Sequence, residues 1–220
     1  MKKIYLLNIE GTNTANVKYA LENNFHIELI LSPLQIEDEE PNIILPGNGS
    51  FGYYVSFLKK NNWISKLSSI INDKKGGKLF SICSGFQVLG ISSEESKGVD
   101  GLKIIDFNFK NLKNYFESPL IINIGRKNIS NIETGIQFKD LGFNEDLIKK
   151  FSMRPYFVHG FASEIDYKSI ARYPEYCYLF TEINKRKILA GMFSENFSGT
   201  QFHPELSGSE WKDFMIRFFK

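Results

Sequence analysis

A cysteine at the junction of a predicted strand and a predicted helix is the feature that most constrains this chain. Residues 80–87 read Phe-Ser-Ile-Cys-Ser-Gly-Phe-Gln, so an apolar run ends at Cys83 and a helix can begin directly after it. Ser81 and Gly85 are small enough for a strand and a helix to meet closely, and such a sharp turn pushes the nucleophile out of the backbone surface. The dipole of the following helix favours the thiolate. The pattern predicts a nucleophilic cysteine, and the alternative is a buried structural one.

A histidine and a carboxylate near the C-terminus supply the groups that such a thiol needs. Residues 199–205 read Gly-Thr-Gln-Phe-His-Pro-Glu. In an extended segment, residues two apart point to the same side, so Glu205 can orient the imidazole of His203. Taken singly, these residues are more simply a half-buried loop histidine and a solvated carboxylate. Together with the cysteine turn, they predict one relay of Cys83, His203 and Glu205.

The alternation of strand and helix patterns predicts the fold class. Such alternation is typical of an α/β fold with a mostly parallel central sheet flanked by helices, which binds ligands at the carboxyl ends of the strands. Pro46, Cys83 and His203 are expected to converge there. Strands are expected at residues 4–7, 26–31, 43–45 and 79–82, and helices around residues 17–21 and 51–58.

The C-terminal half is expected to add further strands, and residues 108–116 a surface loop. A final helix carries an apolar stripe from Trp211 to Phe219, with Ser209 as its predicted N-cap. No shift of composition, repeat or linker divides the chain, so residues 1–220 are expected to form one domain. The additional strands are expected at residues 102–107, 120–124, 154–159, 176–180 and 187–193.

Composition argues against several classes of function. Lysine and arginine number 27 against 25 acidic residues, a formal charge of +2 that is too balanced for a nucleic-acid-binding surface. Only two cysteines are present, so Cys177 is expected to be a buried strand residue, with no disulfide framework and a cytoplasmic location. Three histidines without short ligand spacing make a metal site unexpected, and no cofactor is predicted. The N-terminal apolar run is too short for a signal peptide, and no run reaches the ~20 residues of a membrane span.

The two motifs together resemble the class I glutamine amidotransferases, whose nucleophilic cysteine, histidine and glutamate match Cys83, His203 and Glu205. Residues 45–52, Leu-Pro-Gly-Asn-Gly-Ser-Phe-Gly, resemble the Pro-Gly-x-Gly loop of one branch, the glutaminase subunits of imidazole glycerol phosphate synthase. Residues 92–95, Ser-Ser-Glu-Glu, and 156–159, Tyr-Phe-Val-His, also resemble that branch. The resemblance runs from about Ile4 to the C-terminus. It implies a subunit that hydrolyses L-glutamine and passes ammonia to a separate synthase subunit.

The remaining site residues follow from this resemblance and from the expected turn. The backbone N–H of Ser84 is the first expected oxyanion donor, and the flexible loop at Gly47 and Asn48 is expected to supply the second. The alternative to a substrate contact is, for Gln87, a side chain that faces solvent. For Glu94 and Glu95 it is a solvated acidic pair. His159 is expected to be a structural hydrogen-bonding residue. The resemblance implies that the substrate contacts are Gly49, Gln87, Glu95, Gly160 and Phe161.

Three segments depart from the branch that the chain resembles. Residues 10–13, Glu-Gly-Thr-Asn, replace Gly-x-Gly-Asn, and residues 139–144, Lys-Asp-Leu-Gly-Phe-Asn, replace Pro-His-Met-Gly-Trp-Asn. Leu206 stands where the branch has a lysine. That lysine and the tryptophan, here Phe143, contact the cyclase in the branch, so the resemblance implies an altered docking face and a partner that is a diverged relative of the cyclase.

Three alternatives to a histidine-pathway glutaminase remain open at this stage. The first is a paralogue that supplies ammonia to an N-acetyl sugar amidotransferase in surface polysaccharide biosynthesis. The second is a non-catalytic partner-binding scaffold, which would be expected to lose Cys83, His203 or Glu205. The third is a free-standing thiol hydrolase of another γ-glutamyl compound.

Overall fold

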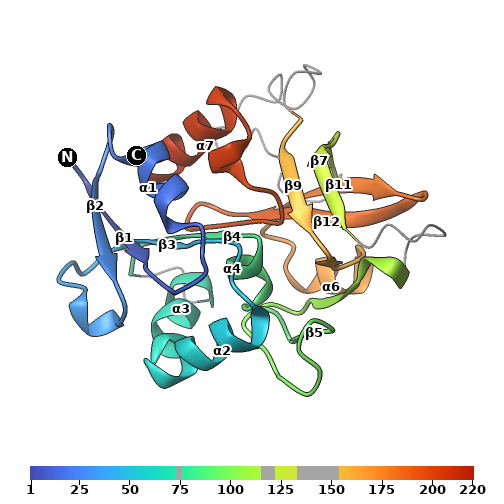
Figure 1. Ribbon diagram of the computed structural model, residues 1–220, viewed down its shortest axis with the longest axis horizontal. Helices are drawn as coiled ribbons and strands as arrows, with labels where there is room; N and C mark the ends of the chain where they lie inside the picture. Colours follow the sequence, from blue (N-terminus) through green and yellow to red (C-terminus); the bar gives the residue numbers. More distant parts are fainter. Residues whose placement is uncertain (73–75, 115–121, 133–153) are drawn as a thin grey trace.

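A single large sheet organises the computed structural model, which describes residues 1–72, 76–114, 122–132 and 154–220 (Figure 1). Five neighbouring strands at one end of the sheet run parallel, and the three strands at the other end continue it antiparallel. The expected α/β fold with a mostly parallel central sheet is therefore confirmed. In spatial order the strands are β2 (His26–Ile30), β1 (Lys3–Leu7), β3 (Asn42–Leu45), β4 (Lys78–Ile82), β13 (Phe197–Thr200), β12 (Arg186–Phe193), β11 (Cys177–Ile183) and β8 (Ser130–Asn131).

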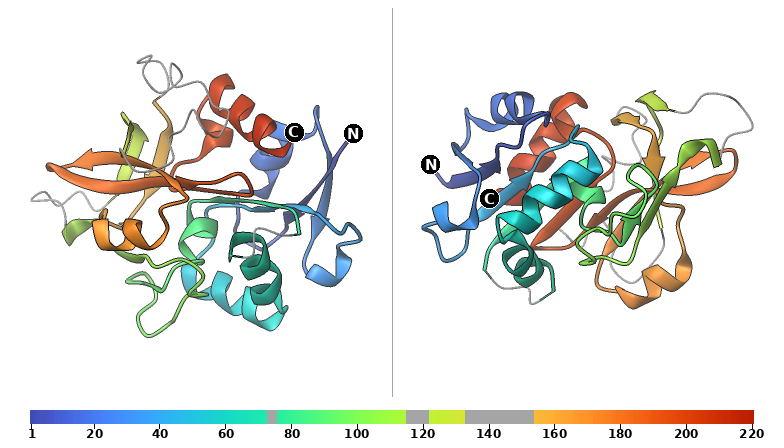
Figure 2. Two further views of the ribbon diagram at one scale, coloured as in Figure 1. Left: turned by 180° about the vertical axis from the view of Figure 1, so that it is seen from behind. Right: turned by 60° about the horizontal axis from the view of Figure 1, so that its bottom comes forward.

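Helices cover both faces of the parallel part of the sheet. The helices α1 (Thr14–Leu21) and α7 (Ser209–Phe219) lie on one face, and α2 (Phe51–Lys60), α3 (Trp63–Asn72) and the short α4 (Ser84–Gln87) lie on the other (Figures 1 and 2). Each helix turns an apolar stripe towards the sheet. The stripe expected on α2 is confirmed, because Phe51, Tyr54, Val55 and Leu58 are all buried.

An aromatic cluster joins α7 to the centre of the sheet. Phe80 on β4 is fully buried and makes edge-to-face contacts with Phe214 and Phe218, at ring-centroid distances of 5.9 and 5.5 Å. Trp211 packs on Phe202, which lies one residue before His203, at 4.4 Å. The stripe from Trp211 to Phe219 is therefore core, and its packing fixes the segment that carries His203.

Two smaller sheets lie beside the antiparallel end of the main sheet. One joins β10 (Phe161–Ala162), β6 (Asn108–Asn111) and β5 (Ser92–Ser93), and the other pairs β7 (Asn123–Arg126) with β9 (Tyr156–His159). The expected additional strands of the C-terminal half are present as β9, β11 and β12. The remaining described elements are α6 (Tyr167–Arg172) and the 3₁₀ turns η1 (Pro33–Gln35), η2 (Leu112–Asn114) and η4 (Pro204–Leu206).

The strand expected at residues 102–107 is wrong. The N–H groups of Leu102 and Ile104 donate to the carbonyls of Val88 and Leu89 at 2.9 and 2.8 Å, so the main chain satisfies the end of the helical turn after Cys83. The apolar side chains in this segment are buried, as the sequence pattern indicates. The segment therefore has the buried apolar side chains of a strand, but its N–H groups bond to the turn after Cys83 and not to a neighbouring strand.

Three further expectations are corrected at element boundaries. The strand β6 lies inside the expected loop 108–116, because Phe109 is buried and packs against Phe86. The predicted strand 120–124 is partly outside the described residues, and β7 begins at Asn123. Ser209 is the first residue of α7, not its N-cap; Gly208 occupies that position with φ 104°.

Residues 139–144, including Phe143, lie outside the described residues. In the part of the chain that the structure describes, no helix has the length and apolarity to cross a membrane.

Replacing Phe80 with alanine is expected to lower the free energy of unfolding by about 3–5 kcal/mol, because the change opens a cavity between the sheet and α7. Denaturant-induced unfolding measures this value. The control is Leu34→Ala at a side chain that is 93% exposed, for which a change within about 0.5 kcal/mol is expected. A loss below about 1 kcal/mol for Phe80→Ala would contradict the packing described here.

Candidate active site

Cys83 occupies a strained turn between β4 and α4. Its φ and ψ angles are 49° and −112°, in a region that side-chain-bearing residues rarely adopt. The turn is held by the bond from Cys83 N–H to the carbonyl of Thr200 at 2.7 Å, and by the N–H groups of Phe86 and Gln87, which donate to Cys83 O at 3.0 and 2.9 Å. The sharp turn expected from residues 80–87 is present in the structure.

Small residues make room for this turn, as the spacing predicts. A Cβ atom on Gly85 would lie 2.5 Å from the carbonyl oxygen of Leu45, so only glycine fits there. Ser81 is fully buried, and its hydroxyl donates to the carbonyl of Ser198 at 3.4 Å. Gly85 therefore lies where α4 approaches the end of β3, and Ser81 lies where β4 pairs with β13.

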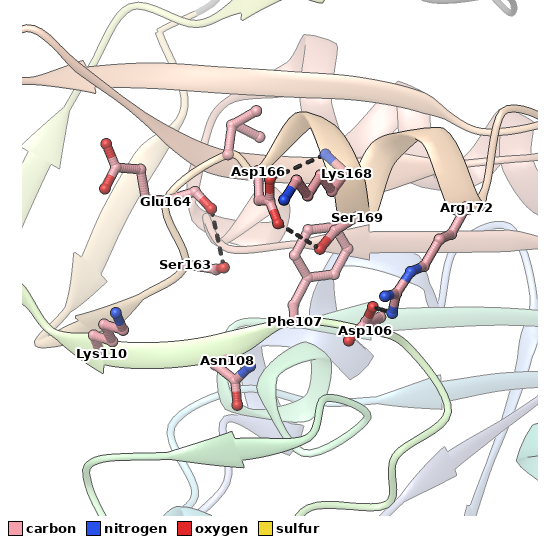
Figure 3. Close-up of a pocket in the computed structure, with 11 residues that line it drawn as sticks. Asp106, Phe107, Asn108, Lys110, Ser163, Glu164, Asp166, Lys168, Ser169 and Arg172 are labelled. Atoms are coloured by element: carbon pink, nitrogen blue, oxygen red, sulfur yellow. Dashed lines mark hydrogen bonds and ion pairs between the residues drawn. The ribbon is translucent and has the colours of Figure 1, made fainter.

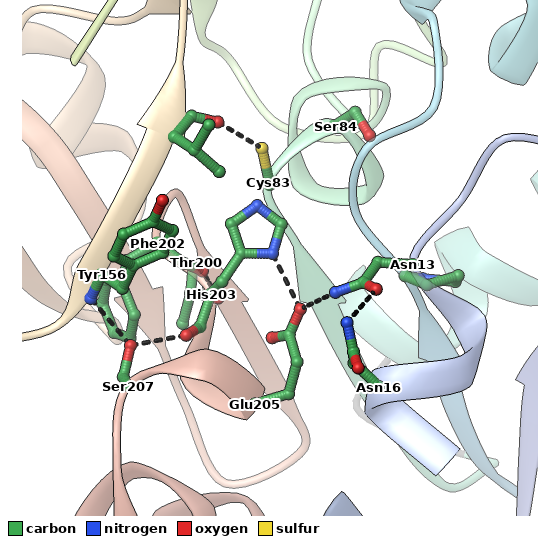
Figure 4. Close-up of polar contacts among 12 residues, drawn as sticks. Asn13, Asn16, Cys83, Ser84, Tyr156, Thr200, Phe202, His203, Glu205 and Ser207 are labelled. Atoms are coloured by element: carbon green, nitrogen blue, oxygen red, sulfur yellow. Dashed lines mark hydrogen bonds and ion pairs between the residues drawn. The ribbon is translucent and has the colours of Figure 1, made fainter. Parts of the chain in front are cut away.

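His203 and Glu205 lie beside Cys83 in the arrangement that the sequence predicts. The imidazole Nδ1–H donates to Glu205 Oε1 at 2.8 Å, and the other ring nitrogen faces Cys83 (Figure 4). Burial lowers the pKa of His203, but the neighbouring Cys83 and Glu205 outweigh that effect and raise it to about 10. The site therefore favours the imidazolium form of His203 at neutral pH.

The loop between β3 and α2 packs directly against these side chains. A Cβ atom on Gly47 would lie 2.7 Å from His203 Cε1 and 3.0 Å from Cys83 Cβ. Asn48 has a positive φ of 70°, and Gly49 N–H donates to the hydroxyl of Ser84 at 2.9 Å. The structure thus brings the expected oxyanion residues Gly47, Asn48 and Ser84 next to Cys83.

Two side-chain amides form a chain of hydrogen bonds that begins at the sulfur of Cys83. Gln201 Nε2 donates to Cys83 Sγ at 3.8 Å, and the Cys83 thiol in turn donates to the carbonyl of Val158 at the same distance. Gln87 Nε2 donates to Gln201 Oε1 at 3.0 Å and to the carbonyl of Phe161 at 2.9 Å. Gln87 is 3% exposed, so the alternative in which it faces solvent is wrong. Gln201 was not singled out from the sequence, although it lies two residues before His203 and therefore on the same side of an extended segment.

The acidic pair after the cysteine turn holds backbone groups. Glu95 Oε1 accepts from the N–H of Phe51 at 3.2 Å, at the start of α2, and burial raises the pKa of Glu95. Glu94 Oε2 accepts from the N–H of Asn111 at 2.7 Å. Both residues are exposed, as the alternative of a solvated acidic pair has it, but each carboxylate is held by a backbone N–H of a different segment.

His159 has the environment of a structural histidine. Its Nδ1–H donates to the carbonyl of Phe161 at 3.0 Å, which leaves Nε2 to accept from Asn123 Nδ2 at 3.0 Å. Burial lowers the pKa of His159 to about 4, so the ring is neutral at physiological pH. The neighbouring carbonyl of Gly160 accepts from the N–H of Leu112 at 2.8 Å. Together these bonds fix residues 159–161 beside Gln87.

A polar pocket of about 470 Å³ lies elsewhere, between β6, the segment after β10 and α6 (Figure 3). Its acidic residues are already engaged: Asp106 with Arg172, and Asp166 with the N–H of Lys168 at 3.0 Å. Three acidic and three basic side chains line it, so it carries no net charge. Among the described residues, no group of histidine, cysteine, aspartate and glutamate has the arrangement of a metal site.

Comparison with known proteins identifies the family. The family described as glutamine amidotransferase class-I matches residues 6–220. This chain belongs to that family.

Its relatives include subunits of one synthase. The chain is 30% identical to the imidazole glycerol phosphate synthase subunit HisH of Pyrococcus furiosus over 217 residues, with 94% of this chain and 93% of that protein covered. It is 25% identical to the subunit HisH of Pectobacterium atrosepticum over 228 residues, with 99% of each protein covered. Among solved structures, PurLQS from Thermotoga maritima shares the fold, with a TM-score of 0.60, 20% identity, and coverage of 98% of this chain and 96% of that one.

Gly47→Ala is expected to reduce glutamine hydrolysis by about tenfold or more, because the added Cβ displaces the His203 ring or the loop that contacts it. Steady-state kinetics measures the loss, and circular dichroism checks the fold. Gly98→Ala is the control. It also adds a Cβ atom, and its φ of 79° adds backbone strain, but nothing lies within 4 Å of that atom, so the site is untouched. Native turnover by Gly47→Ala would contradict the close packing of this loop.

Proposed function

We propose that this chain is a glutaminase subunit, which hydrolyses L-glutamine to glutamate through a thioester on Cys83 and passes ammonia to a separate synthase subunit. The observation that carries the proposal is the strained Cys83 turn facing His203, whose Nδ1–H is held by Glu205 at 2.8 Å. This geometry supplies a nucleophile, a base and an orienting carboxylate in one place. A decayed scaffold has no need of this arrangement, so the assembled relay argues against the non-catalytic alternative.

The proposed reaction has two steps. The thiolate of Cys83 attacks the carbon of the substrate carboxamide, and the imidazolium of His203 gives its proton to the departing ammonia as the C–N bond breaks. The imidazole then takes a proton from water, whose oxygen attacks the thioester carbon. The C–S bond breaks and regenerates the thiolate, the new carboxyl group of glutamate loses its remaining proton to solvent, and the imidazolium keeps the proton taken from water. Glu205 holds the imidazole through both steps.

The proposed oxyanion hole combines the turn and the loop. Ser84 N–H, at the start of α4, is the first donor. The peptide between Gly47 and Asn48 is the second, although in this structure its carbonyl accepts from the N–H of Asn13 at 2.8 Å. Since carbonyl and N–H of a trans peptide point in opposite directions, the orientation of this one peptide decides whether Asn48 N–H faces the substrate.

The proposed substrate contacts begin with the side-chain amide of Gln87. Phe161 O only accepts hydrogen bonds, so the N–H end of the Gln87 amide must face it, and Gln87 Oε1 is left to receive the ammonium group of glutamine. The carboxylate of Glu95 adds negative charge for the same group. Main-chain groups complete the contacts that we propose, at Gly49, Gly160 and Phe161.

The remaining proposals concern the whole chain. We propose that residues 1–220 form a single glutaminase domain without a cofactor. The location that we propose is the cytoplasm, where a free thiol such as Cys83 stays reduced. Cys177 is buried at the start of β11, as expected from the sequence.

The partner that we propose is a synthase like the cyclase of imidazole glycerol phosphate synthase, because the HisH relatives match over nearly the whole chain. One observation favours a second candidate, the paralogue that serves an N-acetyl sugar amidotransferase. Leu206, directly after Glu205, is 37% exposed, so an apolar group stands where the branch has a docking lysine. Loss of a charged anchor can cost about 2 kcal/mol or more of binding free energy.

Cys83→Ala is expected to abolish glutamine hydrolysis while leaving the fold intact, because no other group can form the thioester. An electrophilic glutamine analogue should label Cys83 and leave Cys177 unmodified, as mass spectrometry of the digested protein will show. Glu205→Ala should lose less activity than His203→Ala, since an orienting group usually contributes less than the base it holds. Labelling at Cys177, or equal activity in all variants, would refute the mechanism.

The isolated chain is expected to hydrolyse glutamine weakly, and the true partner with its own ligand to raise the rate by about a hundredfold, the value of one oxyanion donor. The assay compares a histidine-pathway cyclase with a sugar amidotransferase. Stimulation by the cyclase alone, with imidazole glycerol phosphate formed, would remove the sugar candidate, and the reverse result would support it. Full turnover without any partner would show a free-standing hydrolase.

A further inference from the structure

The loop before α1 reaches the catalytic carboxylate. Asn13 Nδ2 donates to Glu205 Oε1 at 2.7 Å, across 192 positions of sequence (Figure 4). This is the same oxygen that accepts from His203 Nδ1 at 2.8 Å. One carboxylate oxygen therefore receives two N–H groups, one from the imidazole and one from the asparagine.

Glu205 depends on that oxygen for its orientation. Its other oxygen, Oε2, is buried and meets no hydrogen-bond partner among the described residues. A carboxylate held through one oxygen by a single donor can rotate away from it, whereas two donors from different directions define its position. Asn13 is the donor that does not change its charge during the reaction.

The orientation of the asparagine is itself determined. Asn16 Nδ2 donates to Asn13 Oδ1 at 2.7 Å, so the carbonyl end of the amide faces Asn16 and the N–H end faces Glu205. Asn13 also stands at the N-cap position of α1, where asparagine is strongly preferred, yet its side chain makes no capping bond there. The side chain is thus diverted from stabilising its own helix to holding Glu205.

The main chain of the same residue reaches the oxyanion loop. Asn13 N–H donates to the carbonyl of Gly47 at 2.8 Å. A single residue therefore contacts both the carboxylate that orients His203 and the peptide that we propose as an oxyanion donor.

We infer that Asn13 is a positioning residue of the reaction, which fixes the carboxylate of Glu205 so that Oε1 faces the imidazolium. The inference deepens the proposed function and relies on it only for the reaction that is assayed. Without the Asn13 amide, Glu205 orients and stabilises the imidazolium of His203 less well, so His203 activates the sulfur of Cys83 less effectively. Both alkylation of Cys83 and glutamine hydrolysis then slow down.

The test follows the rate of Cys83 alkylation by iodoacetamide in the isolated chain, from about pH 5 to pH 9, together with kcat and KM for glutamine. Asn13→Ala is expected to lower both the alkylation rate and kcat by about tenfold, the effect of losing one charge-assisted hydrogen bond. KM should stay unchanged, since the amide binds Glu205 and not the substrate.

Asn13→Asp gives a result that a merely structural role would not produce. Two carboxyl groups in contact cannot both ionise easily, so one of them has a raised pKa. Below that pKa the shared proton restores an O–H donor between residues 13 and 205. Above it, two negative charges repel. The rate relative to the native chain should therefore rise towards one as the pH falls, while Asn13→Ala stays low throughout.

Asn23→Asp is the matched control, because it adds the same charge at an exposed position beyond α1 and should behave like the native chain. If Asn13→Ala does not fold, the pH profile of the isosteric variant Asn13→Asp tests the inference by itself. Native rates in Asn13→Ala, or an Asn13→Asp profile without the recovery at low pH, would overturn the inference. If alkylation follows the expected pattern but no variant hydrolyses glutamine, the positioning role stands and the proposed function fails.

Discussion

The parallel pairing of β4 with β13 is the contact on which the site depends. Ile82 pairs with Thr200 in the ladder, and Cys83 N–H continues it by donating to Thr200 O at 2.7 Å. Both strands end at the same edge of the sheet, so Cys83 and His203 meet there although 120 positions of sequence separate them. An antiparallel pairing would place the end of one strand beside the start of the other. The packing of Phe80 and Trp211 against α7 then keeps this edge in place.

The turn at Cys83 stores strain that this framework has to offset. A side-chain-bearing residue with positive φ costs of order 1–3 kcal/mol, and the surroundings must hold it there. Three main-chain hydrogen bonds and the glycine at position 85 do so. The site is therefore built into a tightly hydrogen-bonded part of the sheet, and the loop at Gly47 and Gly49 packs against it.

Much of this arrangement could be predicted from the sequence, because its signals are local. Strand and helix periodicity predicted the positions of β1, β2, β3 and β4 along the chain, and the spacing around Cys83 and His203 indicated the turn and the relay. The predicted strand at residues 102–107 failed because burial and strand pairing look alike in a short apolar run. The contacts of Asn13 and Gln201 could not be predicted, although both residues lie in segments noted in the sequence, because their partners are more than 100 positions away. Contacts of that kind become visible only when the chain is folded.

The side-chain amides of Gln201 and Gln87, beside Cys83, have a fixed orientation. Gln201 presents its N–H end to the sulfur and its oxygen to Gln87, whose own oxygen faces no donor among the described residues. The two dipoles therefore align head to tail, with the positive end at the sulfur and the negative end at Gln87 Oε1. Turning either amide around would set two oxygens or two N–H groups against each other. A pair of neutral side chains thus creates opposite potentials at two neighbouring points, one suited to an anion and the other to a cation, without placing a net charge in the core.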